Sequence, residues 1–189
     1  MSEVIKFNTE ELAKPIVQVD KPKVFDLISE DDVLLQKGLE DFDFANPPVN
    51  PNQFASTLVE TCKDLKGIGL SANQCGFPYR VFVMGAGDDY VAFFNPKIIQ
   101  VSNEEVHMLE GCLSFPLLGL NITRPKMIEV EYQDFNGVSR KATFDGLSAR
   151  CFQHEYDHMN GVTFIQRAKP LALKSGLTKR KKLIKRIII

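Results

Sequence analysis

The sequence predicts an α+β fold in which antiparallel sheets pack around a central metal-binding helix. Residues 128–144 have the alternation and the turn of an antiparallel hairpin, and a helix pattern over residues 147–159 follows at once. Another helix pattern begins near residue 51. The chain has 189 residues, of which 44% are apolar and 25% charged, and this suits one well-packed domain.

Residues 1–49 show no regular pattern, and Asn46-Pro47-Pro48 indicates a loop. The first helix is predicted to begin after Asn50, which can cap it, with Pro51 at the first helical position. Gly67 can end this helix. Four residues share its apolar face: Phe54, Leu58, Cys62 and Leu65.

Residues 67–74 are too rich in glycine for a regular helix. Residues 79–84 and 90–99 are predicted to be strands, separated by a turn over residues 85–89. In residues 128–133 apolar and polar side chains alternate, which is the period of a half-buried strand. Asn136-Gly137 is a strong turn signal, and residues 138–144 are predicted to return as the partner strand.

The helix that follows carries the most informative motif of the chain. Asp145 can cap it, Asn160-Gly161 ends it, and residues 154–158 form an H-E-x-x-H pattern. His154 and His158 lie four residues apart on one helix face, where both can bind one metal ion. Glu155 is adjacent to the first histidine, so it can exchange protons with a water on such an ion, whose pKa falls to about 7.

The third ligand must come from upstream, because no Asp, Glu, His or Cys follows His158. Cys112 is favoured, since Gly111 and Pro116 indicate a shaped loop around it. Cys62 belongs to a helix face and is expected in the core. The other candidates that remain open are Cys75, His107 and several carboxylates.

The composition indicates the cellular compartment and the charge distribution of the protein. The four cysteines form no C-x-x-C pair, which predicts free thiols in a reducing compartment. Met1 to Lys6 lack a basic region followed by an apolar run, so a cytoplasmic location is expected. Residues 169–189 contain eight Lys or Arg and no acidic residue. Because the whole chain has a net charge of −1, residues 1–168 carry a net charge of −9. The chain is therefore predicted to consist of one catalytic domain over residues 1–168 and a basic C-terminal tail or helix over residues 169–189.

Three ordered segments resemble the motifs of peptide deformylases: residues 67–74 (GIGLSANQ), 110–114 (EGCLS) and 153–158 (QHEYDH). The resemblance implies removal of the formyl group from the N-terminal formyl-methionine of newly made polypeptides. It also implies the metal ligands Cys112, His154 and His158, with an open fourth position. The implied ion is Fe²⁺, although Zn²⁺, Ni²⁺ and Co²⁺ suit the same donor set in preparations.

The resemblance assigns further roles. Glu155 would be the general base and then the acid, while the Gln74 amide and the Leu113 backbone N–H would donate to the oxyanion. The backbone of Gly69 would hold the peptide extended. The methionine pocket would comprise Ile68, Met108, Leu147, Cys151 and His154, of which the first three could equally be ordinary core residues. Glu110 and Arg124 would form an ion pair that braces the ligands.

Three positions depart from the family pattern: Ser71 replaces the usual Ala, Met159 the usual Leu, and Gly119 an Arg found in many bacterial relatives. The implied partners are formyl-methionyl nascent peptides, and the basic tail suits a contact with ribosomal RNA. We expect a monomer and no membrane association. The two competing hypotheses are an ordinary H-E-x-x-H metallopeptidase and a nucleic-acid-binding protein with a structural metal.

Overall fold

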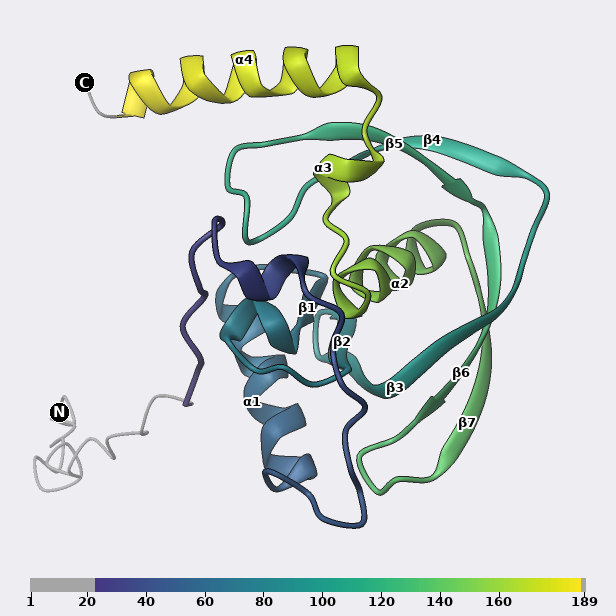
Figure 1. Cartoon of the computed structure of the whole chain (residues 1–189). Helices are drawn as coiled ribbons and strands as arrows, with labels where there is room; N and C mark the ends of the chain where they lie inside the picture. Colours follow the sequence, from purple (N-terminus) through teal and green to yellow (C-terminus); the bar gives the residue numbers. More distant parts are fainter. Residues whose placement is uncertain (1–22, 188–189) are drawn as a thin grey trace, which may run out of the picture.

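The computed structural model describes residues 23–187, and its strands form two antiparallel sheets (Figure 1). The larger sheet has the order β1 (Gly69–Ser71), β2 (Val81–Ala86), β3 (Asp89–Val101), β6 (Met127–Gln133), β7 (Ser139–Asp145). The smaller sheet pairs β4 (Glu105–Glu110) with β5 (Leu120–Pro125). The helices are α1 (Pro51–Asp64), α2 (Gly146–Met159), α3 (Phe164–Arg167) and α4 (Pro170–Ile187), with the 3₁₀ turns η2 (Val33–Gln36) and η3 (Ala72–Cys75). The α+β prediction is confirmed.

Both long predicted helices form where their sequence signals place them. The side chain of Asn50 accepts a hydrogen bond from the Gln53 N–H at 2.9 Å, as a helix N-cap does. Asp145 caps α2 by accepting from the Gly146 N–H at 2.6 Å. The helix ends at Met159, and Gly161 follows with a φ of 70°, a conformation that favours glycine.

The predicted hairpin is present as β6 and β7, which pair in register from Met127↔Asp145 to Gln133↔Ser139. Strands β2 and β3 also form, with boundaries shifted by two residues or fewer from the prediction. Three strands were not expected from the sequence: β1, β4 and β5. They are the strands that border the site described below.

Helix α2 contacts strands of both sheets, and Figure 1 shows it enclosed by them. Its Phe152 ring lies 5.0 Å from Phe82 and 5.3 Å from Phe93, between ring centroids, on the larger sheet. Phe152 is fully buried, and burying such a side chain contributes about 2–3 kcal/mol. This packing fixes α2 against the larger sheet, and Arg150 of the same helix donates to backbone carbonyls of β4 and β5.

The basic tail forms α4, which lies against the loop before β5. A side chain at Gly176 would meet Leu120 Cδ2 at 2.5 Å, so the helix approaches closely only because this residue is glycine. Arg180 donates to the Pro116 carbonyl at 2.9 Å and forms a bidentate pair with Glu30. Beyond Arg180 the described residues of α4 are exposed.

No helix among residues 23–187 is both long and apolar enough to cross a membrane. The prediction of a cytoplasmic location rests on Met1 to Lys6, and these lie outside the described residues.

Candidate active site

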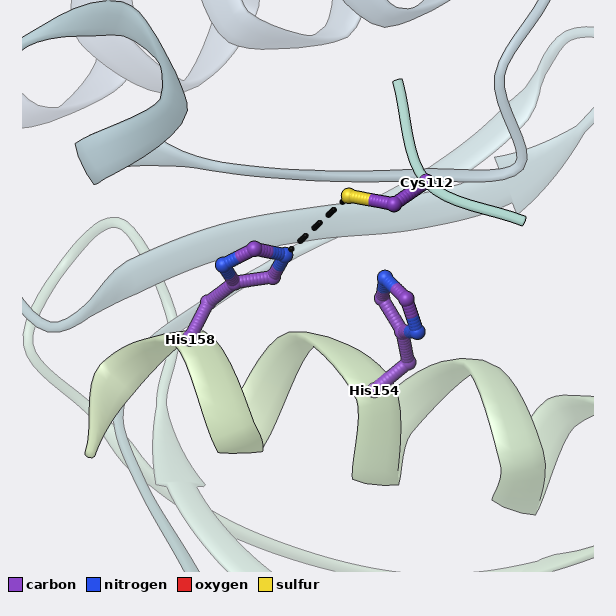
Figure 2. Close-up of side chains that lie close together, drawn as sticks. All are labelled: Cys112, His154 and His158. Atoms are coloured by element: carbon purple, nitrogen blue, oxygen red, sulfur yellow. Dashed lines mark hydrogen bonds between the residues drawn. The ribbon is translucent and has the colours of Figure 1, made fainter. Parts of the chain in front are cut away.

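Helix α2 presents its two motif histidines to a loop from a different part of the chain (Figure 2). The loop follows β4 and carries Cys112, whose Sγ lies 3.4 Å from His158 Nε2. One ligand atom from each of Cys112, His154 and His158 lies within 4.8 Å of the other two. Both histidines are buried and Cys112 is half-buried. The structure thus brings together the three residues that the resemblance implied as ligands.

The 3₁₀ turn η3 places Gln74 beside this cluster. Its Oε1 accepts hydrogen bonds from the Ser71 N–H at 2.9 Å and the Ser71 hydroxyl at 3.0 Å, which fixes the orientation of the amide. The Nε2 group therefore points to the cysteine loop, where it lies 3.0 Å from Ser114 Oγ and 3.4 Å from Cys112 Sγ. Asn73 links the same turn to α2 by donating to the His158 carbonyl at 3.2 Å.

A buried ionic network orients the His154 ring from the side of the ring that faces away from Cys112 and His158. Glu110 Oε2 lies 3.1 Å from His154 Nδ1, which leaves Nε2 to face the cluster. Arg124 donates to both oxygens of Glu110, at 2.7 and 3.0 Å. Burial alone would raise the pKa of Glu110, but the hydrogen bonds from His154 and Arg124 lower it to about 2. Glu110 is therefore a carboxylate that sets the tautomer of His154.

The network contains two further residues that the sequence reasoning missed. Arg150 lies one turn before His154 and donates to Glu110 Oε1 at 2.5 Å and to the Ile122 carbonyl at 2.9 Å. Asp157 accepts from Arg124 at 2.7 Å. Arg150, Glu110 and Asp157 connect α2 to both strands of the smaller sheet. The sequence carries no local signal for Arg150 and Asp157, because charged residues in a helix usually indicate an exposed face.

Glu155 is buried against the backbone of the edge strand β1. A Cβ added to Gly69 would lie 2.5 Å from Glu155 Oε1, so the carboxylate approaches this closely only because position 69 is glycine. Its other oxygen, Oε2, is buried without a hydrogen-bond partner among the described residues. Burial raises the pKa of Glu155 to about 7, with the charge of His154 opposing it. A carboxyl group with a pKa near neutrality can both accept and release a proton.

These groups line a cavity of about 380 Å³. Its lining contains every residue expected around the substrate except Met108, which is half-buried in β4 and does not line it. Leu109, which was not expected, lines the mouth and is 69% exposed. The expected residues that do line the cavity are Ile68, Gly69, Gln74, Cys112, Leu113, Leu147, Cys151, His154 and Glu155.

The other candidate ligands lie outside the cluster. Cys62 and Cys75 are buried in the core that α1 forms with the larger sheet, and burial raises the pKa of each thiol to about 12. His107 is exposed on β4 and pairs with Thr123 at 3.0 Å. All four cysteines are free, as predicted.

The residues present fit a divalent metal ion. A thiolate and two imidazoles are the donor types that zinc, iron, nickel and cobalt accept. Two buried polar atoms of the site, Glu155 Oε2 and His158 Nδ1, have no partner among the described residues, and Oε2 belongs to the residue next to His154 in sequence. The clustered donors therefore fit one ion, and three protein ligands leave a position open for reaction.

Residues 8–174 match the family described as Polypeptide deformylase. A peptide deformylase of Thermotoga neapolitana is 44% identical over 113 residues, which are 60% of this chain and 69% of that protein. A peptide deformylase of Synechocystis is 39% identical over 133 residues, which are 67% of this chain and 71% of that protein.

Solved structures give the same result for the fold. A peptide deformylase from Synechococcus elongatus, in complex with actinonin, superposes with a TM-score of 0.78 at 32% identity and covers 86% of this chain and 90% of its own. The peptide deformylase of Thermotoga maritima gives a TM-score of 0.70 at 37% identity, covering 78% of this chain and 99% of its own.

Proposed function

We propose a catalytic mechanism for this chain, which belongs to the polypeptide deformylase family. It is a hydrolase that removes the N-terminal formyl group from newly made polypeptides, whose first residue is formyl-methionine. In our proposal Cys112, His154 and His158 hold one divalent ion, and Glu155 moves the protons. The observation that carries this proposal is the cluster of one thiol and two imidazoles, which come from two of the three ordered motifs.

The products from formyl-Met-Ala-Ser distinguish this function from the alternatives. Release of formate together with intact Met-Ala-Ser is expected. Cleavage between Met and Ala would identify a metallopeptidase. No turnover of the peptide would favour a protein whose metal site is only structural. Acetyl-Met-Ala-Ser is the matched control substrate, because only the acyl group differs.

We propose Fe²⁺ as the ion used in the cell. The Cys/His/His donor set also accepts Zn²⁺, Ni²⁺ and Co²⁺, so the same peptide should be assayed with each ion under anaerobic conditions. When bound, a divalent ion supplies a Lewis acid that makes water nucleophilic at neutral pH. His154 is oriented for this ion by Glu110, which Arg124 and Arg150 hold in place.

Glu155 then performs two proton transfers. Its Oε2 takes a proton from the water that attacks the formyl carbon, which becomes tetrahedral. When the bond from this carbon to the methionine nitrogen breaks, Glu155 gives the proton to that nitrogen, so formate and a free amine result. The buried, unpaired Oε2 and the pKa near 7 support both transfers.

Two donors are proposed for the oxygen that gains charge. The Gln74 amide is fixed by Ser71 and points into the cluster. The backbone N–H of Leu113 directly follows Cys112, so it lies next to the ion that Cys112 is proposed to bind. Fixed donors of this kind stabilise a transition state without having to reorganise.

Replacing Gln74 by alanine is expected to lower kcat by about 10²–10³-fold, because a lost oxyanion donor acts on the transition state. Metal content should stay near that of the wild-type protein. The measurement is kcat and KM for formyl-Met-Ala-Ser, with Gln53→Ala on the outside of α1 as the control. A raised KM with an unchanged kcat would make Gln74 a substrate-binding residue instead.

The apolar part of the cavity is proposed to hold the methionine side chain, with Ile68, Leu147 and Cys151 as its walls. The backbone of Gly69 is proposed to hold the peptide extended. Since nascent chains exist where translation occurs, we infer that the protein acts in the cytoplasm. A monomeric state remains a prediction.

We further propose that the end of α4 contacts ribosomal RNA. Arg180 is engaged with Glu30 and Pro116. The exposed basic residues that follow it are proposed to bind phosphates: Lys181, Lys182, Lys185 and Arg186. Removing residues 181–189 keeps Arg180 and should leave turnover of short formyl peptides unchanged.

The same truncation is expected to weaken co-sedimentation with ribosomes at low salt, with a smaller difference as salt rises. The truncation removes four basic residues, so the charge-matched control substitutes four exposed basic residues outside α4 by glutamine: Lys37, Lys97, Arg140 and Lys141. Equal co-sedimentation of the truncated and full-length proteins would show that α4 makes no ribosomal contact.

A further inference from the structure

The cavity has one exposed charged residue in its lining, Lys66. The other charged residues that line it are Glu110, Arg150 and Glu155 together with His154, and all of these are buried. Lys66 forms no ion pair with any residue of the range 23–187, whereas Lys63, one turn earlier, pairs with Asp88 at 3.4 Å. The Lys66 ammonium is therefore free for a ligand.

The backbone at Lys66 keeps this side chain at the mouth. Lys66 directly follows Leu65, the C-cap of α1, and has a φ of 56°, which residues other than glycine rarely adopt. Its N–H donates to the Lys63 carbonyl at 2.9 Å, and the next residue, Gly67, donates to the Cys62 carbonyl at 2.8 Å. A left-handed residue closes the helix here, and glycine would be the usual choice. Lysine at this place adds a charge where the turn itself needs none.

The edge strand β1 defines the direction in which a peptide crosses the cavity. Gly85 N–H donates to the Ile68 carbonyl at 2.9 Å. In an antiparallel ladder the next residue, Gly69, therefore turns its N–H and C=O away from β2, toward the free edge. A peptide that pairs with this edge has its formyl end near Gln74 and Glu155. Its later residues must then run back past Ile68 and Gly67 toward Lys66.

Counting along this path places the charge. β1 begins only at Gly69, and Lys66 lies in the turn that closes α1. With methionine opposite Gly69 and the second residue beside Ile68, the third and fourth residues of the peptide leave the ladder beside Gly67 and Lys66. The rim around them is apolar: Ile68 is 48%, Leu147 58% and Leu109 69% exposed. Apolar walls exclude water from a bound peptide, so an interaction between opposite charges is stronger here than in open solvent.

We propose that Lys66 is a specificity-determining residue that selects formyl peptides with an acidic side chain at the third or fourth position. The inference rests on the proposed function, since it requires a formyl peptide in this cavity. An exposed ion pair of this kind corresponds to a preference of about two- to five-fold in kcat/KM. Because Lys66 is remote from the reacting carbonyl, the preference should appear in KM and leave kcat unchanged.

The test uses formyl-Met-Ala-Asp-Ser and formyl-Met-Ala-Ser-Asp as C-terminal amides, each against its Asn counterpart. The quantity measured is the Asp/Asn ratio of kcat/KM for the wild type, Lys66→Gln, Lys66→Glu and Lys63→Gln. The Lys63 variant changes net charge equally but does not line the cavity. The Asn peptides themselves report deformylase activity, so failure of the proposed function would be seen separately.

The expected result is an Asp/Asn ratio above one in the wild type and in Lys63→Gln. The ratio should fall to about one in Lys66→Gln and below one in Lys66→Glu, and added salt should reduce it in the wild type. A wild-type ratio of one at both positions would overturn the proposal. So would a ratio that survives in Lys66→Gln or falls equally in Lys63→Gln.

Discussion

Replacing Glu155 by alanine is expected to lower kcat for formyl-Met-Ala-Ser by about 10²–10⁴-fold while one metal ion per chain is retained. The reason is that Glu155 is proposed to move both protons and is not a ligand. Its Oε2 is buried with no partner in the described part of the chain, so its removal breaks no hydrogen bond of that oxygen. The measurement is single-substrate kinetics on protein of known metal content.

The control for this experiment is Glu60→Ala, which removes a helix glutamate outside the cavity. A metal-loaded Glu155→Ala protein that retains most of its activity would contradict the assignment of Glu155 as the general base. Loss of the metal in this variant would instead give the residue a role in holding the site together.

Replacing Cys112 by serine is expected to weaken metal binding by more than about ten-fold. Loss of a residue that merely orients a ligand already costs about 10–100-fold, and here a ligand itself is changed. A thiolate is also a far better donor for such ions than a neutral hydroxyl. Metal content after dialysis against a chelator measures the effect.

Cys62→Ser and Cys75→Ser are the matched controls, because each makes the same change at a cysteine away from the cluster. Both residues are buried, so their variants should lose thermal stability but keep the metal. Similar metal loss in all three variants would leave the third ligand unidentified.

The helices and the main hairpin were predictable because their signals are local. Asn50 and Asp145 cap helices within three residues of the groups they bind, and Asn136-Gly137 sets a turn by its own backbone preferences. The two histidines of α2 share a face for the same reason, since helix geometry alone places them there.

The smaller sheet could not be predicted because its stability comes from distant residues. In β4 only Glu110 is buried, so none of the apolar side chains of the strand is fully buried. Glu110 is buried because Arg124 and Arg150 pair with it, and Arg150 lies 40 residues away. An arginine in a helix usually indicates an exposed face, so nothing local predicts this network.

The residues at the mouth of the cavity also could not be predicted from local sequence. Leu109 lines the mouth although the family pattern pointed to Met108, because the cavity meets β4 only at its end, from Leu109 through Glu110 into the loop that follows. Lys66 is a similar case. Its neighbourhood depends on how α1 ends, and a lysine after a helix is by itself an ordinary surface residue.

The most direct test of the account is a titration of metal-free protein with Fe²⁺ under anaerobic conditions, followed by formate release from formyl-Met-Ala-Ser. No turnover is expected without metal, and the rate of formate release should rise linearly with added Fe²⁺ until one ion per chain is bound. The Cys112→Ser protein should show no such rise in rate over the same range. Formate release by metal-free protein, or a rise that continues to two ions per chain, would contradict a single-ion site made by Cys112, His154 and His158.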